Sequence, residues 1–181
     1  MLRIVSLPPF RAAVSRPDPK DSFSPKGALG RFDRYFSALQ PSPRDSFMPR
    51  DFLYFDQEQG GMVWMYALAE GLSDGGFPTA DFPGGLYATY VWRDGDEAEN
   101  ARLYRRTLEE IEATGTLAPD DTRPAMGHII TPPEVQSALG YAQMETFLPI
   151  RVKKKPLPAK RGRPSLNGLP LTSIFFRFIR E

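Results

Sequence analysis

The chain has 181 residues, of which 41% are hydrophobic and 25% charged, as in an ordinary soluble globular protein. It contains no cysteine, which excludes disulfides, thiolate zinc sites and a cysteine nucleophile and indicates a reducing, cytoplasmic location. Its single histidine, His128, excludes a metal site built from several histidines, and the apolar runs are too short to cross a bilayer. No nucleotide-binding glycine motif is present. We therefore expect a globular domain without metal, cofactor or membrane anchor.

Charge divides the chain into an acidic body and a basic tail. Residues 151–181 contain nine Lys and Arg and one acidic residue, a net charge of +8, whereas residues 1–150 carry 14 Lys and Arg and 21 acidic residues, a net charge of −7. An acidic surface attracts cationic ligands and a basic one attracts polyanions. The expected organisation is a domain at 1–152 and a flexible basic tail at 153–181.

The first half of the chain has the pattern of strand, helix and hairpin. In residues 28–39 apolar side chains recur at the spacing of one helical face, which predicts a helix. Proline and glycine clusters mark the loops. The predicted elements are a strand at 2–15 interrupted by two prolines, a loop at 16–26, the helix at 28–39, strands at 51–56 and 62–72 joined by a tight turn, and a loop at 73–83.

The second half repeats this pattern. Ala101, Tyr104, Leu108 and Ile111 lie on one face of a helix predicted at residues 97–114. The remaining predicted elements are strands at 85–93, 126–131 and 144–152 and a loop at 132–140. The chain thus has two strand–helix–strand–strand units. Two such units predict an α+β fold with pseudo-two-fold symmetry, in which a mixed or antiparallel sheet carries both helices on one side.

The last predicted strand carries an acid among apolar residues. Side chains alternate between the two faces of a strand, so Met144 and Thr146 share one face and Glu145 and Phe147 share the other. The carboxylate of Glu145 therefore faces either solvent or a cavity. From the residues alone, a solvated surface acid is the more common arrangement.

Three segments together resemble a known family. They are LPPFRAAVSR at 7–16, GGLYATYVWRDG at 84–95 and METFLPIRV at 144–152. Their order and spacing resemble landmarks of the GyrI-like small-molecule-binding domain, which is also the effector-binding part of many MerR- and AraC-type bacterial transcription regulators. The resemblance covers residues 1–152, and the chain resembles a stand-alone member of this family.

The resemblance implies a ligand groove between the two halves, which in this family takes apolar, often aromatic and cationic compounds. It also implies that a glutamate of the last strand lies in that groove, and here the matching residue is Glu145. Many members carry an aromatic–Glu pair on the preceding strand, where this chain has Gly127 and His128. At these two positions this chain has no acid to form a two-acid site with Glu145.

Aromatic residues supply further candidates for a ligand site. Trp64 and Tyr66 share a face of one predicted strand, and Trp92 and Tyr87 belong to another. A cation over a Trp or Tyr face gains roughly 0.5–2 kcal/mol. The alternative for each aromatic residue is ordinary packing of the sheet against the helices. The candidate ligand-binding residues are Glu145, Trp64, Tyr66, Trp92, Tyr87 and Phe147.

The basic tail contains Arg161, Gly162, Arg163 and Pro164, which resemble the core of an AT-hook. In that motif, two arginines enter the narrow, strongly negative minor groove of A·T-rich DNA. The expected contact with DNA is weak and salt-sensitive. The alternative is a solvated charged tail without a nucleic-acid partner.

Four functions remain open from the sequence. The leading one is a binding protein for small hydrophobic or cationic molecules, acting as sensor, sequestering agent or toxin-resistance factor. A second is a hydrolase of strained-ring DNA-alkylating compounds, with Glu145 as general acid or base. A third is a protein-binding inhibitor of a DNA-associated enzyme, and a fourth is a regulator that reaches DNA through its tail.

Overall fold

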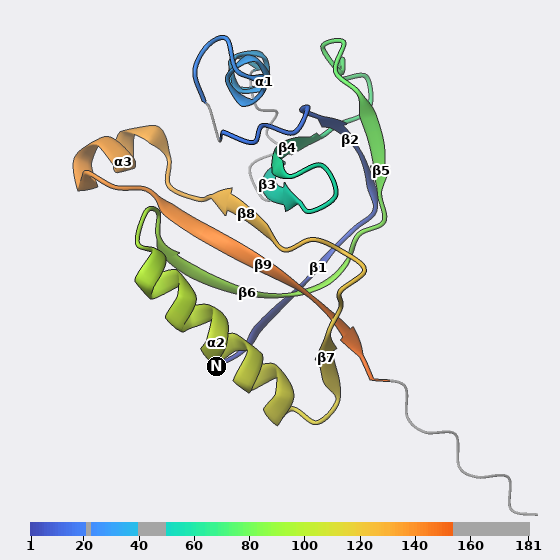
Figure 1. Cartoon of the computed structure of the whole chain (residues 1–181), viewed down its shortest axis with the longest axis vertical. Coiled ribbons are helices and arrows are strands. Elements are labelled where there is room, and N and C mark those ends of the chain that lie inside the picture. The colour runs from blue at the N-terminus through green and yellow to red at the C-terminus, as the bar shows by residue number, and fades with distance from the viewer. Residues whose placement is uncertain (21–22, 40–49, 154–181) are drawn as a thin grey trace, which may run out of the picture.

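The computed structural model describes residues 1–20, 23–39 and 50–153 (Figure 1). The strands in this part of the chain are β1 (Arg3–Leu7), β2 (Phe10–Val14), β3 (Asp51–Asp56), β4 (Gly61–Ala67), β5 (Thr79–Phe82), β6 (Gly85–Arg93), β7 (Leu117–Pro119), β8 (Met126–Ile129) and β9 (Gln143–Val152). The helices there are α1 (Ala28–Phe36), α2 (Glu97–Ala113) and α3 (Pro133–Leu139). None of these helices is long and apolar enough to span a membrane.

The strands form one curled sheet in the order β1-β6-β9-β8-β3-β4-β2-β5, with β7 paired to β9 (Figure 1). Every described ladder is antiparallel. The two halves meet where β8 pairs with β3, a ladder of only two residue pairs, Leu53 with Gly127 and Tyr54 with Met126. This architecture confirms the predicted α+β fold and identifies the β3–β8 ladder as the junction of the halves.

Both longer helices pack against the same face of the sheet. Residues opposite one another in adjacent strands point to the same side. This face therefore runs from Trp64 on β4 through Leu53, Gly127 and Thr146 to Tyr90 on β6. Helix α1 covers it at the Trp64 end and α2 covers it at the Tyr90 end. The prediction of two helices on one side is confirmed, and the middle of this face lies between them.

The opposite face of the sheet carries a buried apolar cluster. Its buried members are Leu7, Ala12, Phe52, Met65, Tyr87, Met126 and Phe147. They come from strands of both halves, and a large apolar side chain contributes about 1.5–3 kcal/mol when it is fully buried. This cluster therefore stabilises the contact between the halves.

The N-terminal strand is interrupted at Pro8 and Pro9 as predicted, and its two parts have different pairing partners. Residues 2–15 form two strands, because Pro8 and Pro9 interrupt the ladder. Strand β1 pairs with β6 of the second half, whereas β2 pairs with β4 and β5 of the first half. The two prolines thus mark where the chain passes from one half of the sheet to the other.

Several boundaries differ from the prediction. The segments predicted as loops at 73–83 and 132–140 contain β5 and α3, and β7 has no predicted counterpart. The predicted return strand at 62–72 ends at Ala67, and the helix predicted at 28–39 ends at Phe36. The short strands β5 and β7 are held by β2 and β9, partners distant in sequence, so a local residue pattern does not indicate them.

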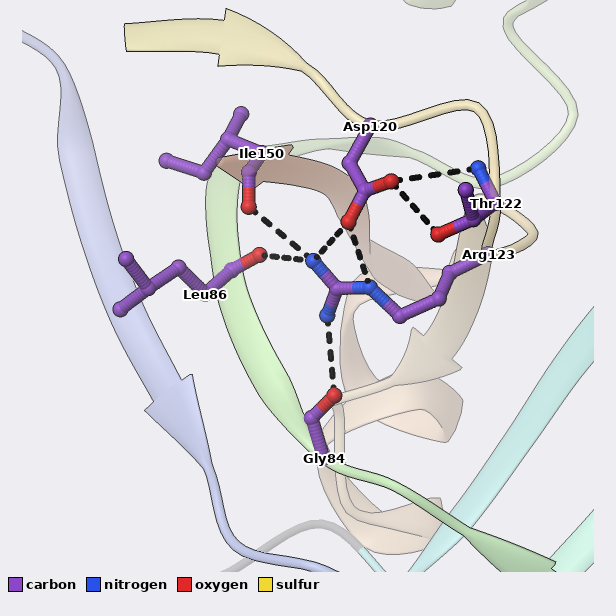
Figure 2. Close-up of polar contacts among 6 residues, drawn as sticks. All are labelled: Gly84, Leu86, Asp120, Thr122, Arg123 and Ile150. Atoms are coloured by element: carbon purple, nitrogen blue, oxygen red, sulfur yellow. Dashed lines mark hydrogen bonds and ion pairs between the residues drawn. The ribbon is translucent and has the colours of Figure 1, made fainter. Parts of the chain in front are cut away.

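An arginine whose side chain is 12% exposed, Arg123, ties the second half together (Figure 2). The guanidinium of Arg123 donates to the main-chain oxygens of Gly84, Leu86 and Ile150 at 3.0, 3.2 and 3.0 Å. It also donates twice to the Asp120 carboxylate, at 3.1 and 3.0 Å. These contacts connect β6, β9 and the segment between β7 and β8, so we name this group the arginine clamp.

Two neighbours show how closely the arginine clamp is packed. Hydrogen bonds from Thr122, together with Arg123, hold the pKa of Asp120 below its usual value. Gly85 has a φ of 130°, and a β-carbon there would collide with the Arg123 guanidinium. Glycine is therefore required at this position both by its backbone conformation and by the available space.

Candidate functional site

A groove lies on the helical face of the sheet, between α1 and α2. It consists of two adjoining cavities of about 390 and 710 Å³. Ligand pockets in proteins have volumes of roughly 300–1,000 Å³. The residues that line both cavities are Leu53, Met62, Trp92, Glu97, Asn100, Gly127 and Met144. The floor of the groove includes the β3–β8 junction, so the groove lies between the halves of the molecule.

The groove exists because α2 packs on the sheet through only part of its apolar stripe. Leu108 and Ile111, in its second half, pack with the sheet residues of β6 and β9. Tyr104 and Ala101, one and two turns before Leu108, line the first cavity instead, and Tyr104 is 44% exposed. In the floor, Gly127 contributes no side chain to the space between the helices. The first half of α2 therefore presents the apolar side chains of Ala101 and Tyr104 to the cavity.

Two tryptophans form walls of the groove, and hydrogen bonds hold both. Trp92 is 7% exposed, and its Nε1 donates to Oγ1 of Thr146 at 2.9 Å. Nε1 of Trp64 donates to Oδ2 of Asp51 at 3.2 Å, and Phe23 packs edge-on to the Trp64 ring at 5.8 Å. Because both indole N–H groups are engaged, the orientation of each ring is fixed before a ligand arrives.

The charged groups of the groove are acidic. Asp51, Asp94 and Glu97 line it, and no Lys or Arg of the described residues does. The hydroxyl of Tyr90 donates to Oδ1 of Asn100 at 2.9 Å, and burial raises the pKa of this tyrosine, so it stays neutral. Carboxylates beside aromatic walls suit an apolar cation better than an anion.

The structure divides the predicted aromatic residues among three places. Trp64 and Trp92 line the groove. Tyr66 lies on the same face, but its ring stacks on Phe36 at 4.5 Å within the α1 contact. Tyr87 and Phe147 lie on the opposite face and are buried in the core. Two of the five predicted aromatic residues are thus brought together around the cavities.

Glu145 is not part of the groove lining. It lies on the opposite face of β9 from Thr146, is 7% exposed, and its carboxylate accepts a hydrogen bond from Nη1 of Arg3 on β1. Arg3 also donates to Thr89 at 3.3 Å. The acid that attracts attention in the sequence is therefore paired with a basic residue 142 positions earlier in the chain. Its assignment to a ligand site stays a prediction.

Several residues that line the groove were not among the predicted site residues. Glu97, Asn100 and Tyr104 come from α2, and Met62 and Met144 come from the sheet. A signal was present in Met62, which shares a strand face with Trp64. The tail residues Arg161, Gly162, Arg163 and Pro164 lie outside the described residues. Within the described ranges, no cluster of His, Asp or Glu could hold a metal ion.

No protein-family model and no curated protein matches the chain. Several solved structures share its fold. SAV2435 bound to tetraphenylphosphonium is 10% identical with a TM-score of 0.50, and the match covers 83% of this chain and 94% of that one. The EcmrR C-terminal domain is 14% identical with a TM-score of 0.54, and the match covers 83% of this chain and 97% of that domain. A hydrolase from Listeria innocua is 10% identical with a TM-score of 0.51, and the match covers 83% of this chain and 91% of that one. The chain therefore shares its fold with these proteins, in agreement with the fold that the resemblance to GyrI-like domains implies.

Proposed function

We propose that the chain binds small apolar cations, aromatic ones above all, in the groove between α1 and α2. The observation that carries this proposal is the pairing of two hydrogen-bonded tryptophans, Trp64 and Trp92, with acidic side chains and no described Lys or Arg in the lining. A cation against an indole face gains up to about 2 kcal/mol when it is desolvated. The carboxylates add attraction for the charge.

The rim of the groove supports the same class of ligand. Phe23, Phe55 and Tyr104 line the cavities and are 52%, 46% and 44% exposed. Large apolar side chains gathered at one exposed place mark binding sites more often than chance. A flat or multi-ringed compound would cover them on entry. The burial of this apolar surface would add to the cation–aromatic contacts.

The test uses tetraphenylphosphonium, the compound bound in SAV2435, as the probe. Because both tryptophans of the chain line the groove, binding is expected to quench the intrinsic fluorescence. Trp92→Leu should weaken binding about tenfold, which is ~1.4 kcal/mol. The neutral compound triphenylphosphine oxide should bind more weakly, and tetraphenylborate, an anion, should not bind.

Glu145→Gln is the matched control, because it removes a carboxylate on the opposite face of the sheet. Its affinity for the probe should equal that of the wild type. Loss of binding in Glu145→Gln with unchanged binding in Trp92→Leu would place the site on that opposite face, as the sequence resemblance implies. Recovery of intact ligand after long incubation separates a binding protein from a hydrolase.

We infer a sensing or sequestering role in the cytoplasm for this binding activity. The basic segment 153–181 carries eight Lys and Arg and one acidic residue, a net charge of +7. This charge supports an additional contact with DNA. Truncation after Lys153 is expected to abolish retention on A·T-rich DNA in a gel shift at low salt and to leave binding of the cation unchanged. Equal retention of the truncated and full-length chains would contradict the DNA contact.

A further inference from the structure

We propose that a proton on His128 competes with a bound cation for the carboxylate of Asp51, so that the groove releases cations as the pH falls. The inference rests on the proposed function and adds a means of regulating it. It makes Asp51 the shared partner of a groove tryptophan, of the single histidine and of the ligand. Its basis is the arrangement of three side chains on β3, β4 and β8.

The hydrogen bonding of His128 defines its neutral form. Its Nδ1 lies 2.9 Å from the main-chain oxygen of Asp51 and 3.2 Å from Oδ1 of the same residue. Because a carbonyl oxygen only accepts, Nδ1 carries the hydrogen and the lone pair of the neutral ring is on Nε2. The next proton therefore binds at Nε2. This protonation leaves the contacts of Nδ1 with the main-chain oxygen and Oδ1 of Asp51 intact, and it adds a positive charge beside the Asp51 carboxylate.

Asp51 connects this charge to the wall of the groove. Its Oδ2 accepts the hydrogen bond from Trp64 Nε1 at 3.2 Å, while its Oδ1 faces His128. All three residues line the larger cavity, although the strand pairing of His128 with Glu145 assigns it to the opposite face of the sheet from Trp64. With neutral His128, the negative charge of Asp51 acts on whatever enters the groove. With protonated His128, that charge is compensated within the protein before a ligand arrives.

The other charges around His128 limit the size of the effect. Glu145 is its cross-strand neighbour on β9, but Arg3 is paired with that carboxylate. Asp94 and Glu97 line the same cavity and supply further carboxylates with which His128 makes no described contact. Protonation should therefore weaken cation binding without abolishing it. We expect a decrease of about tenfold, within the usual range of coupling between two ligands.

Coupling of this kind is reciprocal. A bound cation must disfavour the proton on His128 by the same factor by which the proton disfavours the cation. Imidazole side chains change charge between about pH 8 and pH 5, which makes both directions measurable. Since the chain has one histidine, the imidazole C2 proton signal in an NMR spectrum belongs to His128 without further assignment.

The experiment measures the affinity of the full chain for tetraphenylphosphonium at about pH 8 and about pH 5.5. The wild type should bind about tenfold more weakly at the lower pH. His128→Gln keeps an amide donor for the Asp51 main-chain oxygen but cannot become charged, so its affinity should not depend on pH in this range. The control Asp94→Asn removes a groove carboxylate that His128 does not contact, and it should bind more weakly overall while keeping the pH dependence.

An NMR titration of wild-type His128, with and without the cation, completes the test. Its midpoint should move to lower pH when the cation is present. Equal affinity at both pH values, or the same pH dependence in His128→Gln, would overturn the inference while leaving the proposed function intact. If tetraphenylphosphonium neither binds at either pH nor moves the titration, both the inference and the proposed function fail.

Discussion

Arg123→Ala is expected to lower the free energy of unfolding by about 3–5 kcal/mol, the range for breaking a buried ion pair. The variant leaves three main-chain oxygens, those of Gly84, Leu86 and Ile150, without their donor. It also leaves the carboxylate of Asp120 without its cation. Side chains of both ion-pair partners are at least 86% buried, so water replaces these contacts poorly.

Equilibrium unfolding in urea measures this effect. Arg106→Ala is the matched control, since Arg106 pairs with Glu110 on the exposed surface of α2 and such pairs contribute little to stability. Arg123→Lys keeps the charge but lacks the planar fork that reaches several acceptors, so its stability should lie between wild type and Arg123→Ala. Similar midpoints for Arg123→Ala and Arg106→Ala would show that the arginine clamp does not stabilise the fold.

Phe32→Ala is expected to lower the free energy of unfolding by about 3–5 kcal/mol as well, as is usual for truncation of a buried phenylalanine. Phe32 is fully buried between α1 and the sheet. Its ring packs against Phe36 at 4.5 Å, Phe77 at 5.0 Å and Trp64 at 5.9 Å. Since Trp64 is a wall of the groove, the same substitution should weaken the binding of tetraphenylphosphonium.

Phe55→Ala provides a control of identical chemistry. Phe55 is 46% exposed at the rim of the groove, so its truncation should affect stability far less than that of Phe32. Urea unfolding and the fluorescence titration can be run on the same two variants. If Phe32→Ala leaves stability unchanged, α1 is not held on the sheet by this side chain, and the Phe32 ring does not support the Trp64 wall of the groove.

Where the groove forms depends on how α2 sits on the sheet. A helix that covered the sheet along its whole apolar stripe would bury Ala101 and Tyr104 as it buries Ile111, and the cavities would be filled. Apolar contact is made through Leu108 and Ile111 in the second half of the helix, whereas the first half contacts the sheet through the Tyr90–Asn100 hydrogen bond. The first half of α2 faces β3 and β4, which belong to the N-terminal half of the molecule, across the groove. The ligand site is therefore a consequence of how the two units are joined, and neither unit contains it alone.

Local patterns in the sequence were sufficient for the main elements. The alternation in β9 assigned Thr146 and Glu145 to opposite faces, and the helical spacing of Leu29, Phe32 and Phe36 identified α1. Two repeated units then implied an α+β sheet with both helices on one side. These predictions succeeded because each depends on the period of a strand or a helix, which neighbouring residues determine.

Only the tertiary structure decided which face opens into a cavity. Glu145 attracted the ligand-site prediction, yet its carboxylate is paired with Arg3 from the far end of the chain, and the groove lies on the other face of the same strand. The pairing of Asp51 with Trp64 and His128 likewise joins three strands. Periodicity separates the two faces of a strand, but what covers each face depends on contacts between residues that are distant in sequence.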